Sequence, residues 1–252
     1  AKVDTTDELS RRDNFAFGIS LAGSIFALGI VLSGAVTGAT ADSLQIEVLG
    51  MLVYGIIGLL FIKFGRYLHD KIALNRINKM QLIQDQNTSV AIVDASSAIA
   101  TALIIRAVLV WVEGLNEYTL LAIVTGFLVS QAVLLSLTRI METRYASNNQ
   151  NDSMQLALAN DNTALAIRHA GYVIGTALAV TAGSSLLVYE ATAIVSNLTG
   201  WLVVGVVMTI VLQLLLFVAK KLVLKGINLI EEVDQQENIG VAAIELCITI
   251  AI

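Results

Sequence analysis

The stretch DNTALAI at residues 161–167 decides the fold, because the chain contains three more stretches of the same kind. In each, an acid or Gln precedes an Asn, and small and apolar residues follow. The other three stretches are DNFAFGI at 13–19, QNTSVAI at 86–92 and ENIGVAA at 237–243. Asp and Asn cap helix N-termini, and acids are stabilised at the positive end of a helix. The pattern therefore predicts four equivalent helix starts, at Asn14, Asn87, Asn162 and Asn238.

Long apolar blocks surround these helix starts. Hydrophobic residues make up 56% of the 252 residues and charged residues 14%, and the mean hydropathy is +0.78. Soluble domains carry about 25% charged residues, so the composition excludes a soluble enzyme. A nucleic-acid binder would also need a clustered basic surface. We name seven blocks A to G, at residues 14–36, 44–66, 88–112, 118–139, 162–184, 194–219 and 239 to the end.

A helix needs about 20 apolar residues to cross the hydrocarbon core. The seven blocks therefore predict an all-α, polytopic membrane helix bundle with seven visible spans. Block G is shorter than a full span, and we expect eight spans in the full protein. Except for Arg106 and Arg168, every Lys and Arg lies before A or at the B–C, D–E and F–G junctions. Cytoplasmic loops retain positive charge, so these three loops are predicted to be cytoplasmic.

Blocks A, C, E and G also share small residues. Counting from each Asn as zero, position +9 is Gly23, Ser96, Gly171 and Cys247. Small residues let membrane helices approach closely, so these four spans are predicted to be central and packed on two sides. E comes four spans after A, an even offset, which predicts two parallel four-helix repeats. We place the first repeat at residues 1–145 and the second at 146–252.

These residues resemble a known family. The resemblance rests on DNFAFGISLAG at 13–23, YGIIGLL at 54–60, RYLHDK at 66–71 and ENIGVAAIE at 237–245, beside the stretches above. The chain resembles the DUF350 (YjfL-like) family of bacterial inner-membrane proteins, as a tandem-repeat member. The resemblance implies a multi-pass protein of the bacterial inner (plasma) membrane with eight spans. It implies no activity, because the family has none established, although relatives are often encoded near PspA-like membrane-stress proteins.

Position +7 is the candidate functional position. It is Leu21 in A, Asp94 in C, His169 in E and Glu245 in G. An acid near mid-membrane costs about 2.5–3.5 kcal/mol, and such residues face a bundle interior or a wet cavity. We predict that Asp94, His169 and Glu245 bind a cation or shuttle a proton in a vestibule. The polar stripes that begin at Asn87, Asn162 and Asn238 would line it.

The alternative is that the +7 groups only fix the helix packing. Asp94 or Glu245 would then pair with His169 or Arg168, since polar pairs hold membrane helices together. Arg106 and Arg168 are the candidate charge partners, although Arg106 could pair with Glu113 and both arginines could snorkel. Gln131 and Gln213 are expected to donate interhelical hydrogen bonds. His69 and Asp70 are expected to form a solvated turn.

Two functions follow from these patterns. The first is small-cation or proton-linked permeation that uses the +7 groups. The second is a non-transporting membrane scaffold, or a stress-response partner protein, that acts through its cytoplasmic loops. No Walker, HExxH, GxSxG or CxxC motif occurs, so we expect neither an enzyme nor a cofactor or metal site. The expected partners are the lipid bilayer and a second copy or another membrane protein, without nucleic acid.

Overall fold

The computed structural model describes residues 3–37, 44–113 and 116–252, and its regular secondary structure there is helical. Six helices are long and apolar enough to cross a membrane: α1 (Phe15–Thr37), α2 (Leu44–Ile72), α4 (Thr88–Trp111), α5 (Glu117–Asn148), α7 (Thr163–Ser184) and α8 (Ile194–Val223). The seventh block forms α9 (Ile239–Ala251), an apolar helix of 13 residues. The prediction of an all-α polytopic bundle is confirmed.

Four short helices precede the helices that begin at the repeated Asn residues. They are the π-helix η1 (Asp7–Arg11), α3 (Lys79–Gln84), α6 (Met154–Ala159) and the π-helix η2 (Ile230–Gln235). Each short helix therefore leads into one of the four helices that begin at a repeated Asn: α1, α4, α7 or α9. These short helices were not predicted, because they lie outside the long apolar blocks in segments expected to be loops.

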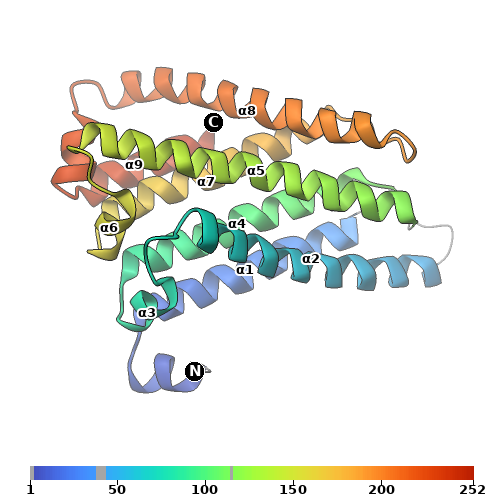
Figure 1. Ribbon diagram of the computed structural model, residues 1–252, viewed down its shortest axis with the longest axis horizontal. Coiled ribbons are helices and arrows are strands. Elements are labelled where there is room, and N and C mark those ends of the chain that lie inside the picture. Colours follow the sequence, from blue (N-terminus) through green and yellow to red (C-terminus); the bar gives the residue numbers. More distant parts are fainter. Residues whose placement is uncertain (1–2, 38–43, 114–115) are drawn as a thin grey trace.

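The long helices form two layers (Figure 1). The inner layer is a row in which α1 contacts α4, α4 contacts α7 and α7 contacts α9. The outer layer consists of α2, α5 and α8. Each outer helix lies against the inner helix before it in the chain and the inner helix after it. The bundle is thus assembled from a repeated unit of short helix, inner helix and outer helix.

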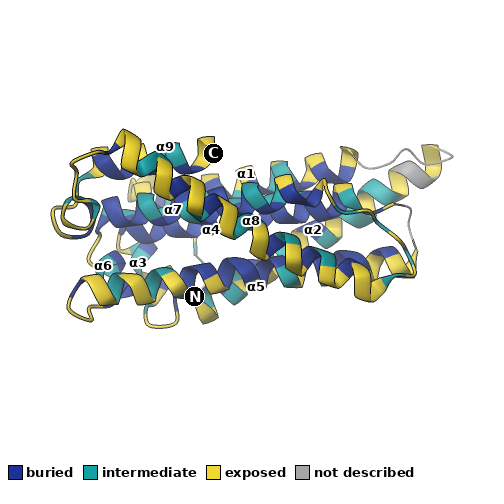
Figure 2. Cartoon of the chain, turned by 90° about the horizontal axis from the view of Figure 1, so that it is seen from above, coloured by how far each residue is buried: buried dark blue, intermediate teal, exposed yellow. Residues whose placement is uncertain are grey.

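Only the middle of the inner row is enclosed. Figure 2 shows α4 and α7 mostly buried, whereas α8 exposes a long face. The prediction that all four inner helices are packed on two sides is therefore wrong for α1 and α9. These two helices lie at the ends of the row, and each has one inner neighbour.

The inner helices begin with the same backbone turn. The residue before each Asn has a positive φ, which is 47° at Asp13, 66° at Gln86, 67° at Asp161 and 55° at Glu237. Each Asn then accepts a hydrogen bond from the backbone N–H three residues later, as Asn87 does from Val90 at 2.7 Å. The four predicted helix starts are confirmed, and their capping explains why Asn recurs there.

Three of the four Asn amides also tie neighbouring units together. Asn14 Nδ2 donates to the Ile83 carbonyl at 2.9 Å, and Asn87 Nδ2 donates to the Ala159 carbonyl at 2.9 Å. Asn162 Nδ2 donates to the Asp234 carbonyl at 3.3 Å. Each acceptor lies in or directly after the short helix of the next unit, so the short helices are held to the ends of the inner row. Of the residues predicted to begin a vestibule lining, Asn87 and Asn162 therefore bond to the next unit, and Asn238 Nδ2 donates to Glu232 Oε2 at 2.7 Å.

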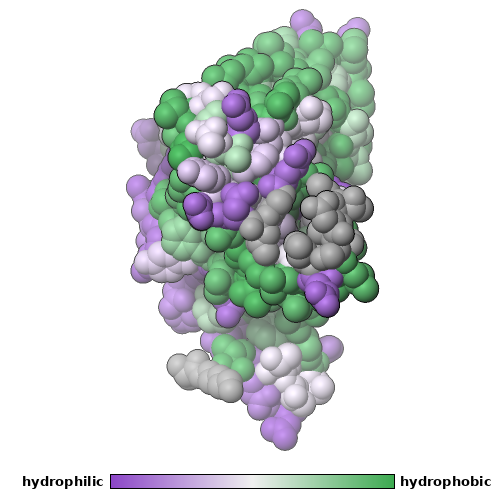
Figure 3. All heavy atoms as spheres, turned by 90° about the vertical axis from the view of Figure 1, so that its right-hand side faces the viewer, coloured by the Kyte–Doolittle hydropathy of each residue, from purple (hydrophilic) through white to green (hydrophobic). Residues whose placement is uncertain are grey.

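The outer helices run beyond the apolar blocks. Block B was predicted to end at residue 66, D at 139 and F at 219, but α2 ends at Ile72, α5 at Asn148 and α8 at Val223. The added turns carry the bases into the end of the bundle that holds the short helices. Figure 3 looks onto the opposite end, where polar residues gather near the loops and hydrophobic residues cover the flanks.

Candidate functional site

Asp94 lies at the centre of a four-residue charge network that joins α2, α3 and α4. Its carboxylate is 0% exposed, with Lys79 Nζ at 2.6 Å from Oδ1 and Arg66 Nη2 at 2.6 Å from Oδ2. Lys79 also pairs with Asp70 at 2.7 Å. We call these residues the first charge network. It alternates acid and base, so two negative charges balance two positive ones.

Glu245 lies in a second charge network with the same alternation. Arg168 Nε is 2.7 Å from Glu245 Oε2, and Lys220 Nζ is 2.6 Å from Oε1. Arg168 also pairs with Asp234 in η2 and donates to the Leu229 carbonyl at 2.6 Å. Burial raises the pKa of the Asp234 carboxyl, and the nearby Arg168 guanidinium opposes that shift. The second charge network therefore ties α7, α8, α9 and η2 together.

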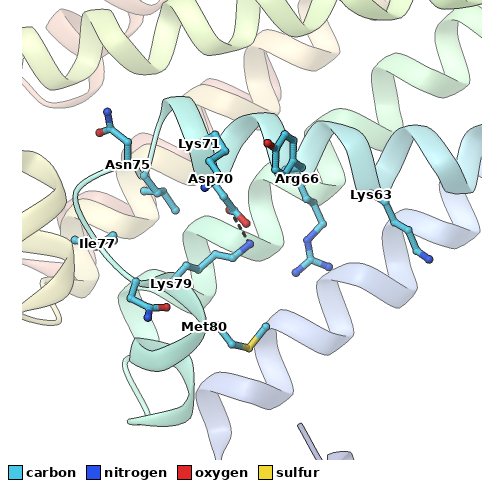
Figure 4. Close-up of a pocket in the computed structure, with 11 residues that line it drawn as sticks. Lys63, Arg66, Asp70, Lys71, Asn75, Ile77, Lys79 and Met80 are labelled. Carbon is cyan, nitrogen blue, oxygen red and sulfur yellow. Dashed lines mark ion pairs between the residues drawn. The ribbon is translucent and has the colours of Figure 1, made fainter. Parts of the chain in front are cut away.

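A cleft opens beside the first charge network, between the end of α2 and α3 (Figure 4). Its volume is about 750 Å³, and its lining includes the bases Lys63, Arg66, Lys71 and Lys79. Asp70 is the acid in that lining. Because Lys79 already pairs with Asp70 and Asp94, the exposed Lys63 and Lys71 leave the cleft with net positive charge.

Nearly the whole chain matches one family profile. The profile of the Domain of Unknown Function (DUF350) matches residues 1–109 and 114–252. The chain belongs to the DUF350 family. No curated protein and no solved structure matches it. The two matched segments agree with a tandem-repeat member, while the unit boundary at 145/146 stays a prediction.

The two charge networks of this DUF350 chain are related by its repeat. Ser20 and Arg168 both occupy position +6, and each donates to the +7 acid of the next inner helix. Ser24 and Tyr172 both occupy position +10, and each accepts from the outer-helix base: from Arg66 at 2.7 Å and from Lys220 at 2.8 Å. The junctions between α1 and α4 and between α7 and α9 are thus built alike.

The middle junction, between α4 and α7, differs. His169 is 0% exposed, and neither ring nitrogen has a hydrogen-bond partner among the described residues. The His169 ring lies edge-on to the His69 ring, with 6.2 Å between ring centroids. Of the two partners that the packing alternative named, His169 pairs with neither +7 carboxylate, because both carboxylates are paired with Lys and Arg. The structure therefore does not bring Asp94, His169 and Glu245 into one polar network.

The two candidate charge partners, Arg168 and Arg106, differ in whether they form an ion pair. Arg168 pairs with Glu245, as the packing alternative predicted, and it does not snorkel. Arg106 donates from Nε to Ser33 Oγ at 3.1 Å, and among the described residues it forms no ion pair, with Glu113 or any other acid. Arg66, Lys79 and Lys220 are partners that were not predicted from the sequence. Positions +6 and +10 held the signal, since polar side chains recur there at the two charged junctions.

Three further expectations concern polar residues near the core. Gln131 donates to Thr101 Oγ1 at 3.2 Å, which confirms an interhelical bond. The buried Nε2 of Gln213 has no partner among the described residues, so that expectation is wrong. The solvated turn at His69 and Asp70 is also wrong. Both residues lie in the last turns of α2, where His69 is buried and Asp70 pairs with Lys79.

Proposed function

We propose that this DUF350 protein is a non-transporting membrane scaffold that holds an acidic segment of a partner protein at the end carrying the short helices. One observation carries the proposal: both +7 carboxylates are buried inside charge networks that already neutralise them. Ion pairs of this kind hold helices together and set their register. The scaffold needs no catalytic step and no cofactor.

The same pairing weighs against a cation pathway. A small cation at Asp94 would have to displace Arg66 or Lys79 and would then lie beside a second base. Repulsion between unit charges is strong at such separations when water is scarce. Proton-linked permeation is the second candidate, because the carboxylate-bearing Glu245 lines a small cavity of about 230 Å³.

The cleft between α2 and α3 supplies the docking surface of the scaffold. Exposed Lys63 and Lys71 flank it, and Asn75 and Asn78 add amide groups suited to a peptide backbone. Carboxylates are the complementary ligands for such a surface. Because bases concentrate at this end, we place it in the cytoplasm of a bacterial cell, beneath the inner membrane.

Flux through proteoliposomes separates the two candidates. We expect proton and potassium leak, followed with a pH-sensitive dye, to equal that of protein-free liposomes. Glu245→Gln should leave the leak unchanged. Flux in the unaltered protein that Glu245→Gln abolishes, in a variant that still elutes as a folded particle, would establish permeation and overturn the scaffold.

Peptide binding tests the docking surface directly. A fluorescent Glu-rich peptide should bind the purified protein more tightly than a Gln-rich peptide of equal length. Lys63→Gln with Lys71→Gln should weaken that binding roughly tenfold, since each rim charge contributes up to about 1 kcal/mol. Lys221→Gln with Lys225→Gln removes the same charge elsewhere and serves as the control. If both double variants lose the same amount of peptide affinity, the cleft is not the docking site.

A further inference from the structure

A second cleft lies on the flank of the bundle, between α5 and α8. Figure 1 shows the two helices running side by side. Toward the C-terminal ends of α5 and α8 they enclose a groove of about 1030 Å³, which is the size of a site for a large organic ligand. The chain turns back over the end of the groove at Gly226, whose φ of +84° favours glycine.

The charged end of this groove is entirely basic. Its lining includes Arg144, Lys220, Lys221 and Lys225 and no acid. Lys220 is already paired with Glu245. In the part of the chain that the structure describes, Arg144, Lys221 and Lys225 form no ion pair, and all three are exposed. Three uncompensated positive charges therefore converge where the apolar wall of α8 ends.

The rest of the groove is mostly apolar and faces outward. Ile140 of α5 and Ile210, Leu214 and Phe217 of α8 line it, and Phe217 is 68% exposed. In a membrane-spanning helix such side chains meet acyl chains. Gln213 also lines the groove, with its buried Nε2 unpaired. It lies two helical turns deeper than Lys220.

We propose that the α5–α8 groove binds an anionic phospholipid. Its phosphate lies among Arg144, Lys221 and Lys225, and an acyl chain follows the apolar wall of α8. Charge complementarity selects the anionic headgroup, and the apolar wall selects a lipid over a free anion. The proposal goes beyond the scaffold function and stands on different side chains from the α2–α3 cleft.

Native mass spectrometry of the detergent-purified full chain tests this assignment with three probes: phosphatidylglycerol, phosphatidylcholine and glycerol 3-phosphate. Phosphatidylglycerol should bind most tightly. The triple variant Arg144→Gln, Lys221→Gln and Lys225→Gln should weaken that binding roughly a hundredfold, because each base near an anionic headgroup contributes a roughly fivefold gain. Lys63→Gln, Lys71→Gln and Arg76→Gln remove three exposed bases elsewhere and should change binding by less than about twofold.

Each other outcome overturns the assignment. Equal losses in the two triple variants would mean that surface charge alone attracts the lipid. Equal binding of phosphatidylcholine would remove the role of the bases. If glycerol 3-phosphate competes as well as the intact lipid, the groove is a site for a free anion. The scaffold proposal survives all three, since its peptide assay uses the other cleft.

Discussion

Asp94→Asn is expected to lower the free energy of unfolding by about 3–5 kcal/mol, because removing one partner of a buried ion pair leaves charge uncompensated. The change leaves Lys79, which is nearly enclosed, with Asp70 alone, and it leaves Arg66 without its acid. It also leaves one carbonyl oxygen in place of the two carboxylate oxygens that accept from Ser20, Arg66 and Lys79. Reversible unfolding in mixed detergent micelles measures the loss.

The matched control for this change is Glu117→Gln. It makes the same chemical replacement at an exposed acid in the first turn of α5. It should change the free energy of unfolding by less than about 0.5 kcal/mol, as most surface substitutions do. If Asp94→Asn is equally mild, the first charge network does not stabilise the bundle.

Gly23→Ala is expected to have the second largest effect. It should lower the free energy of unfolding by about 1–3 kcal/mol, as is typical of overpacking. An added Cβ at Gly23 would lie 2.4 Å from the Ala95 Cβ and 2.7 Å from the Ala95 Cα. A backbone atom cannot rotate away, so α1 and α4 must separate. That separation would also pull Ser20 from Asp94, because the two residues lie on the same pair of helices.

Gly29→Ala is the control in the same helix, since nothing lies within 4 Å of an added Cβ there. It should be neutral or slightly stabilising, because Ala restricts the unfolded chain more than Gly does. The same unfolding assay compares the two. Equal effects would show that α1 and α4 do not depend on close approach at Gly23.

Much of the fold was predictable because lipid imposes simple rules on sequence. Apolar length predicted the spans, the repeated Asn predicted the helix starts, and small residues such as Gly23 and Gly171 predicted close inner contacts. Gly171 indeed lies against the Leu246 backbone, with 2.9 Å from an added Cβ to the Leu246 Cα. Periodicity could not say which helices lie at the ends of the row, because that depends on neighbours far along the chain.

The candidate site was only partly predictable. Asp94, His169 and Glu245 were found from their shared +7 position, but their partners were mostly missed. Arg66, Lys79 and Lys220 lie beyond or at the edges of the apolar blocks, so they were interpreted as loop charges. They are drawn into the bundle because buried carboxylates need compensating charge. The hydropathy of each helix could not show this pairing, because the pairing depends on charges that other helices carry.

The central claim is that the intramembrane carboxylates serve as structural ion pairs, and a double-mutant cycle on Glu245 and Lys220 tests it most directly. Glu245→Gln, Lys220→Met and the double variant are unfolded in the same micelles, with the Arg168–Asp234 pair left in place. We expect the double variant to be more stable than the sum of the single losses predicts, by about 1–3 kcal/mol. Losses that add to within about 0.5 kcal/mol would mean that the two residues do not interact, and would contradict the account.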